Sequence, residues 1–181
     1  MVKMIKNKAF GVIGKPIFNM DYICASASAT PNRWADDVYS RPFTVEEIQE
    51  MIEAFAKTAK LCMDAGVDGV EIHAVHEGYL LEQMTNPAFN RRSLGRYSDW
   101  QAFGLDLVRE IRKRTGARYP IMYRIDLSLA LNETYGQRLK TVKSLKKFGN
   151  ERTVEMTLEY MHNLVKAGVD IFDVDLGCYD N

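Results

Sequence analysis

The chain has 181 residues, which is the size of a single domain. Hydrophobic residues make up 46% and charged residues 27%, a composition that argues against disorder, collagen and coiled coil. The 24 basic residues balance the 24 acidic residues, and no apolar run reaches the ~18 residues of a membrane span, so nucleic-acid binding and membrane insertion are not expected.

Three segments repeat one pattern, in which an amphipathic helix ends at a glycine and a short β-rich run follows. The first helix is expected from about Thr44 to Ala65, because Thr44 and Glu47 match a capping box and apolar residues recur at helical spacing. That apolar stripe comprises Val45, Ile48, Ile52, Phe55, Ala59 and Cys62. The strand that follows is expected at residues 69–73.

The second helix is expected to begin near Ser98, with Gln101 completing another capping box, and its strand is expected at residues 121–125. The third helix is expected from about Glu151 to Ala167, before a strand at residues 171–175. Its predicted buried stripe consists of Val154, Leu158, Met161 and Val165. A further strand is expected near residues 10–13.

Alternating helices and buried, β-branched strands predict a parallel sheet and an α/β fold. No GxGxxG follows a strand, which favours a (β/α)8 TIM barrel over an open dinucleotide-binding sheet. A complete barrel usually takes about 250 residues. We therefore expect residues 1–181 to form one partial barrel domain of about four parallel strands with flanking helices.

The chain has three cysteines without a CxxC pair, at positions 24, 62 and 178. This usage predicts free thiols in a reducing, cytoplasmic compartment and gives no sign of a zinc or iron–sulfur site. The N-terminal 20 residues contain glycine, proline and asparagine breaks and do not read as a signal peptide.

The candidate catalytic residues lie directly after the predicted strand 69–73, at the edge where a parallel α/β fold carries its chemistry. His73, His76 and Tyr79 are spaced by three, so a helical turn would place them on one side. Two imidazoles can hold a carbonyl oxygen by N–H donation, and a phenol can deliver a proton.

Two other interpretations of this cluster stay open. The histidines can be hydrogen-bonded structural groups of the core. They can also bind a metal with nearby acids, as in a metal-dependent TIM-barrel lyase or hydrolase, although HExxH is absent and three committed ligands do not follow from local spacing. The acids in question are Glu71, Glu77, Asp173 and Asp175.

Arg124 stands inside an otherwise apolar strand, where an unpaired charge is costly. One hypothesis is a buried ion pair with Glu71 or Asp126. The other is a permanent cation that faces an anionic cofactor or intermediate.

Several motifs resemble those of the old yellow enzyme, or NADH:flavin oxidoreductase, family. They are the run Val70-Glu71-Ile72-His73, then His76 and Gly78-Tyr79-Leu80-Leu81, with Asn90-Arg91-Arg92 and Tyr97 further on. Further matches are residues 11–16, 44–48 and 123–125. Departures are the extra Glu77 and the stretch 93–100, which lacks the family's usual TD and YGG features.

The resemblance implies an FMN-binding (β/α)8 barrel that reduces the C=C bond of an enone or enoate with NADH or NADPH. It implies that His73 and His76 bind the substrate's carbonyl oxygen and that Tyr79 protonates the α-carbon. It further implies that Arg124 is a cofactor-binding residue at the N1 edge of the flavin.

The resemblance also implies that residues 1–181 match roughly the third to sixth strand units of the barrel, without the strands that hold the FMN phosphate. We therefore expect this chain alone to bind FMN weakly or not at all. A non-catalytic half-barrel that serves as an interaction unit stays open, because open sheet edges invite pairing, and so does a homo-oligomer.

Overall fold

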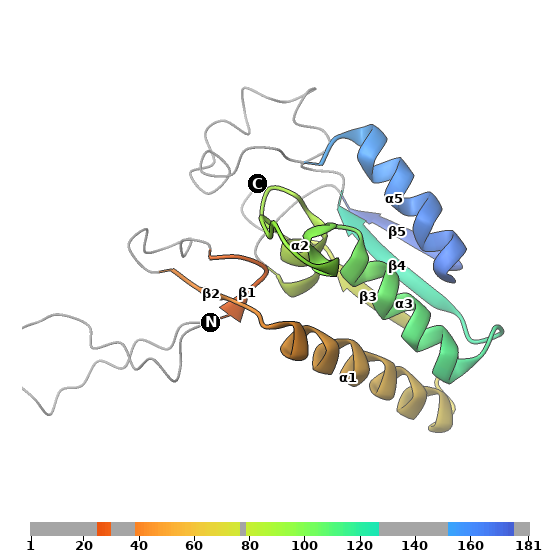
Figure 1. The fold of residues 1–181 in the computed structure, drawn as a ribbon. Coiled ribbons are helices and arrows are strands. Elements are labelled where there is room, and N and C mark those ends of the chain that lie inside the picture. Colours follow the sequence, from red (N-terminus) through yellow and green to blue (C-terminus); the bar gives the residue numbers. More distant parts are fainter. Residues whose placement is uncertain (1–24, 30–38, 77–78, 127–151, 176–181) are drawn as a thin grey trace, which may run out of the picture.

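The computed structural model describes residues 25–29, 39–76, 79–126 and 152–175. Three long helices lie on one side of a parallel sheet, and a short pair of strands lies beside them (Figure 1). The elements are β1 (Ala25–Ser26), β2 (Arg41–Pro42), α1 (Val45–Asp64), β3 (Val70–Ala74), α2 (Leu80–Thr85), the 3-10 turn η2 (Arg96–Ser98), α3 (Ala102–Thr115), β4 (Ile121–Asp126), α5 (Val154–Ala167) and β5 (Ile171–Asp175).

The main sheet has the order β3-β4-β5, and both neighbouring pairs are parallel. Consecutive strands lie side by side and α1, α3 and α5 cover the same face (Figure 1). Each connection between neighbouring parallel strands is expected to be right-handed. When the strands also follow one another in chain order, such connections place every helix on the same face, as in the wall of a TIM barrel. The predicted α/β fold with parallel strands is confirmed, whereas the strand expected at 10–13 lies outside the described residues.

Helix α1 follows its sequence signals. The Thr44 side chain accepts the Glu47 N–H at 3.2 Å, and Glu47 Oε2 accepts the Thr44 N–H at 2.9 Å, so the predicted capping box is present. Ile48, Ile52 and Ala59 are buried as expected, whereas Val45 is exposed.

Helix α3 starts later than predicted. Residues 96–98 form the separate turn η2, in which the Ser98 hydroxyl donates to the Gly95 carbonyl instead of capping α3. Gln101 is the N-cap residue of α3 and makes no side-chain cap, so the expected capping box is wrong. The Gln101 N–H donates to Asp99 Oδ1 at 2.9 Å, and the backbone of Asp99 is extended, so α3 does not continue back into η2.

Helix α5 begins at Val154, where the Thr153 hydroxyl accepts the Met156 N–H at 3.2 Å; its expected start at Glu151 lies outside the described residues. The predicted buried stripe is wrong for Val154, Leu158 and Val165, which are exposed, whereas Met161 is partly buried against the core. The residues that α5 buries against α3 and the sheet are Thr157, Tyr160, Leu164 and Ala167. The polar members of this face are satisfied, as the 2.8 Å contact between the Tyr160 and Tyr123 hydroxyls shows.

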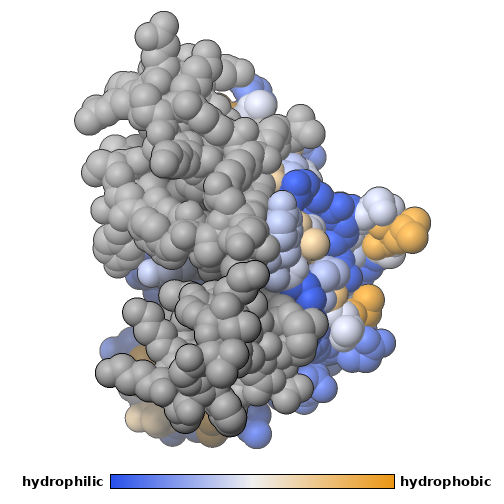
Figure 2. Space-filling model, turned by 90° about the vertical axis from the view of Figure 1, so that its left-hand side faces the viewer, coloured by the Kyte–Doolittle hydropathy of each residue, from blue (hydrophilic) through white to orange (hydrophobic). Residues whose placement is uncertain are grey.

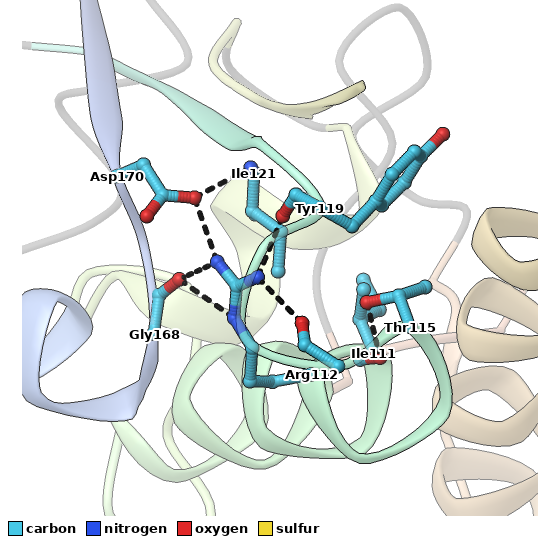
Figure 3. Close-up of polar contacts among 8 residues, drawn as sticks. Ile111, Arg112, Thr115, Tyr119, Ile121, Gly168 and Asp170 are labelled. Atoms are coloured by element: carbon cyan, nitrogen blue, oxygen red, sulfur yellow. Dashed lines mark hydrogen bonds and ion pairs between the residues drawn. The ribbon is translucent and has the colours of Figure 1, made fainter. Parts of the chain in front are cut away.

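Arg112 of α3 joins the N-terminal ends of β4 and β5 (Figure 3). Its guanidinium donates to three backbone carbonyls and to the carboxylate of Asp170, which lies 2.7 Å away. Those carbonyls belong to Gly116, Tyr119 and Gly168. Asp170 Oδ2 also accepts the Ile121 N–H at 2.9 Å, so one side chain and one carboxylate tie the two strand starts together.

The described surface visible in Figure 2 is mainly hydrophilic, with a few separate hydrophobic groups. Among the described helices, none is both long and apolar enough to cross a bilayer.

Candidate active site

The face of the sheet that turns away from the helices carries a polar row. Side chains alternate along a strand, so burial of Ile72, Tyr123 and Ile125 in the helix layer directs their neighbours to the opposite face. In the strand register, His73 pairs with Arg124, and Arg124 pairs with Asp173. Three charged or titratable residues from three strands therefore form one row across this face.

His73, His76 and Tyr79 come together at the C-terminal end of β3. The ring centroids of His73 and His76 are 5.0 Å apart, and the Tyr79 ring is 5.8 Å from His73 and 5.7 Å from His76. The three rings lie together as expected, but not through the helical turn that the spacing of three suggested, because His76 has a left-handed backbone.

The local backbone explains this gathering. His76 adopts a φ of 70°, a left-handed conformation that is uncommon for a residue with a side chain. The Tyr79 N–H donates to the His76 carbonyl at 3.1 Å, which keeps Tyr79 close to His76. Tyr79 is the N-cap residue of α2, so the helix begins directly after the ring cluster. Gly78, which belongs to the motif of the resemblance, lies outside the described residues.

Exposure differs across the cluster. His76 is 6% exposed, whereas Tyr79 is 48% exposed, so the phenol is accessible to a molecule from solvent. Burial lowers the pKa of His73, and the nearby His76 and Arg124 lower it further. A neutral His73 at pH 7 offers one N–H donor and one acceptor nitrogen.

Arg124 is paired, but not with either expected partner. Its Nη2 lies 2.5 Å from Asp175 Oδ2, and its Nε lies 3.1 Å from Asp173 Oδ2. The expectation of Glu71 or Asp126 as the partner is therefore wrong. The strand register explains this result. It pairs Arg124 directly with Asp173, whereas Glu71 pairs with Met122, two residues before Arg124.

A metal centre finds no support in the described ranges, where no group of three or more histidine, cysteine, aspartate or glutamate side chains could hold an ion. Glu77 and two of the cysteines lie outside those ranges. Cys62 is a free thiol, as expected.

Two arginines and an asparagine outside the ring cluster hold neighbouring loops. Arg91 Nη2 donates to the Ala29 carbonyl at 3.0 Å. Asn90 Nδ2 donates to the Met84 and Tyr97 carbonyls at 3.0 Å each. Arg92 Nη1 donates to the Ala27 and Phe43 carbonyls at 3.1 and 2.8 Å, which ties β1 and the start of α1 to this loop. The residues 90–92 of the resemblance thus serve as anchors of the backbone.

Arg152 is a structural residue that the sequence analysis missed. It is fully buried and donates to the Thr85 and Asp126 carbonyls at 3.2 and 2.7 Å and to the Thr157 hydroxyl at 3.0 Å. It therefore links the end of α2, the end of β4 and α5. No sequence pattern around position 152 signals a buried cation.

Comparison with known proteins gives a consistent result. The model of the NADH:flavin oxidoreductase / NADH oxidase family matches residues 16–176. The chain is 34% identical over 162 residues to a cinnamate reductase of Clostridium sporogenes, which covers 88% of this chain and 24% of that relative. It is 30% identical over 144 residues to an NADH oxidase of Thermoanaerobacter brockii, which covers 78% of this chain and 19% of that relative.

Solved structures share the fold. A 2-naphthoyl-CoA reductase bound to 2-naphthoyl-CoA matches with a TM-score of 0.65 and 23% identity over 87% of this chain and 22% of its own. An old yellow enzyme homologue from Zymomonas mobilis matches with a TM-score of 0.58 and 16% identity over 83% of this chain and 41% of its own. The predicted relation to TIM-barrel old yellow enzymes is confirmed, and the chain spans a quarter or less of the two relatives named above.

Proposed function

Because this chain belongs to the NADH:flavin oxidoreductase / NADH oxidase family, we propose that it carries the substrate-facing edge of an FMN-dependent oxidoreductase. The reaction is reduction of the C=C bond of an α,β-unsaturated carbonyl or acyl compound with NADH or NADPH. The observation that carries the proposal is the triangle of His73, His76 and Tyr79 rings, 5.0 to 5.8 Å apart at the end of a parallel strand.

The two imidazoles bind the carbonyl oxygen of the substrate. Their 5.0 Å separation lets an N–H from each ring reach one oxygen, and the lowered pKa of His73 keeps that ring a neutral donor. Negative charge grows on this oxygen as the β-carbon is reduced, so fixed donors stabilise the transition state more than the ground state.

Tyr79 supplies the proton for the α-carbon. Its exposed phenol stands beside both imidazoles, so a substrate held by its oxygen would have its α-carbon near that hydroxyl. General acid catalysis of this kind contributes about 10²- to 10⁴-fold in rate.

The polar row fits the ring of a flavin. Arg124 offers N–H groups on the face away from the helices, and His73 lies beside it in the register. FMN, when bound, supplies the hydride, and the reduced nicotinamide restores it. Arg124 would hold the edge of the ring at which negative charge collects. The chain's part is to orient the ring and substrate and to deliver the proton.

The remaining parts of the proposal are a cytoplasmic location, a small-molecule enone or enoate as substrate, and no nucleic-acid or membrane partner. Free-thiol cysteine usage supports the location, and balanced charge supports the absence of a nucleic-acid or membrane partner. The substrate class rests on the resemblance alone. A homo-oligomer and a single partial barrel domain over residues 1–181 stay predictions.

The test uses the complete protein that the gene encodes and follows the two half-reactions separately by stopped-flow absorbance of FMN. We expect Tyr79→Phe to slow oxidation of the reduced enzyme by an enone about 10²- to 10⁴-fold and to leave its reduction by NADH unchanged. Tyr119→Phe is the control, since its hydroxyl is buried near the N-terminal end of β4 and has no hydrogen bond among the described residues. If Tyr79→Phe slowed both half-reactions by the same factor, Tyr79 would not be the proton donor.

A further inference from the structure

Two carboxylates beside Arg124 have no part in the proposed reaction. Asp173 and Asp175 project from β5 on the same face as Arg124, because Asp173 is its register partner and Asp175 is two residues further along. The Asp175 side chain is 23% exposed and the Asp173 side chain 45%, so Asp175 is the better shielded of the pair.

The two contacts differ in strength. Nη2 of Arg124 donates a hydrogen bond to Asp175 at 2.5 Å. Nε lies 3.1 Å from Asp173 and forms an ion pair, but makes no hydrogen bond among the described residues. Asp175 therefore fixes the position of the guanidinium through a charge-assisted hydrogen bond, whereas Asp173 mainly adds a compensating negative charge.

We propose that Asp175, assisted by Asp173, is a positioning residue that fixes the Arg124 guanidinium plane and neutralises its positive charge. The inference rests on the proposed function, because it concerns an arginine that faces the flavin. Arg124 then acts as an oriented hydrogen-bond donor and not as a net cation.

This arrangement has a consequence for the redox balance. An unpaired guanidinium would favour the reduced, more negatively charged form of a flavin beside it. Two carboxylates at 2.5 and 3.1 Å offset that effect, so the site keeps the cofactor a stronger reductant. Removing a carboxylate charge should therefore raise the reduction potential of bound FMN.

The first arm of the test measures the pKa of His73 by NMR in Asp175→Asn. The groups that face His73 are His76, Arg124, Glu71 and Asp175, of which the first two lower its pKa and the last two raise it. We expect its pKa to fall in Asp175→Asn and to stay near its original value in Asp175→Glu. Asp170→Asn is the matched control, because its carboxylate pairs with Arg112 at the other end of the strand.

The second arm measures the reduction potential of bound FMN in the complete protein. We expect Asp175→Asn to raise it, Asp173→Asn to raise it less, and Asp170→Asn to leave it unchanged. An unchanged potential in FMN-loaded Asp175→Asn would overturn the positioning role and leave the proposed function standing. An unchanged His73 pKa in Asp175→Asn would overturn the placement of this carboxylate beside the polar row, on which the positioning role rests. Failure of the unaltered protein to bind FMN would contradict the proposed function, and with it this inference.

Discussion

Replacement of Arg112 by methionine keeps the aliphatic stem and removes the guanidinium that ties the starts of β4 and β5 (Figure 3). The change leaves three carbonyl acceptors without their charged donor and breaks the 2.7 Å pair with Asp170. With about 1 kcal/mol for each hydrogen bond and less than about 1 kcal/mol for the half-exposed ion pair, Arg112→Met should lower the free energy of unfolding by about 3 kcal/mol.

The assay is urea unfolding of the 181-residue chain followed by far-UV circular dichroism, with an unchanged m-value as the sign of an unaltered fold. Arg109→Met is the control, because Arg109 is 54% exposed and lies 3.3 Å from Asp106, a pair expected to contribute less than about 0.5 kcal/mol. A loss under about 1 kcal/mol for Arg112→Met, or an equal loss for both variants, would refute the reasoning.

The pH dependence adds a second check on Arg112. Burial by itself would raise the pKa of Asp170, but hydrogen bonds from Ile121 and Arg112 outweigh it and lower that pKa. A carboxyl with a lowered pKa stabilises the fold above its unfolded pKa and loses that contribution as the pH falls through the folded value. The part of the Arg112→Met effect due to Asp170 should therefore fade at acidic pH, whereas the part due to the carbonyls should persist.

Three further substitutions test other contacts. An alanine Cβ at Gly104 would lie 1.8 Å from the Tyr160 hydroxyl, so Gly104→Ala should cost about 1–3 kcal/mol in urea unfolding, and Tyr160→Phe in the same chain should recover part of it. Arg152→Met removes the donor of three buried acceptors and should cost about 2–4 kcal/mol, measured in the same way; a loss within experimental error would show that water replaces it. The hydrogen bond from Arg41 lowers the pKa of Glu47 from 4.5 to about 2, so Glu47→Gln should reduce the melting temperature above pH 4.5, and the difference should close as the pH approaches 2. A difference that stays constant with pH would contradict this role.

The ring cluster could be predicted from the sequence because its signals are local. A β-branched run that ends at His73 places that residue at a strand end, and His76 and Tyr79 follow within six residues, so their ring centroids lie 5.0 and 5.8 Å from that of His73. The left-handed backbone at His76 could not be predicted, since a φ of 70° is uncommon for any residue with a side chain, although histidine adopts it more often than most. The same limit applies to Arg124, whose partners depend on which strand lies next to it.

The buried face of α5 shows a second limit. Residues 154, 158, 161 and 165 and residues 157, 160, 164 and 167 both recur at helical spacing, so periodicity predicts the helix but not its orientation. Three of the four residues of the more apolar set are exposed. The other set can be buried because Tyr160 finds a hydrogen-bond partner in Tyr123 and Thr157 donates to the Thr153 carbonyl at 2.9 Å. Satisfied polar groups can occupy a core that apolar residues would be expected to fill.

The register between β4 and β5 determines both the contacts at the N-terminal ends of these strands and the position of Arg124 in the polar row. The contact between Asp170 and the Ile121 N–H lies one residue before the register pair of Met122 and Ile171. A slip of one residue would move Arg124 to the opposite face, since side chains alternate along a strand. The guanidinium of Arg112 stabilises the register that places Arg124 beside Asp173. Variants that loosen this end of the sheet should therefore disturb the polar row as well as stability, although Arg112 contacts none of its residues.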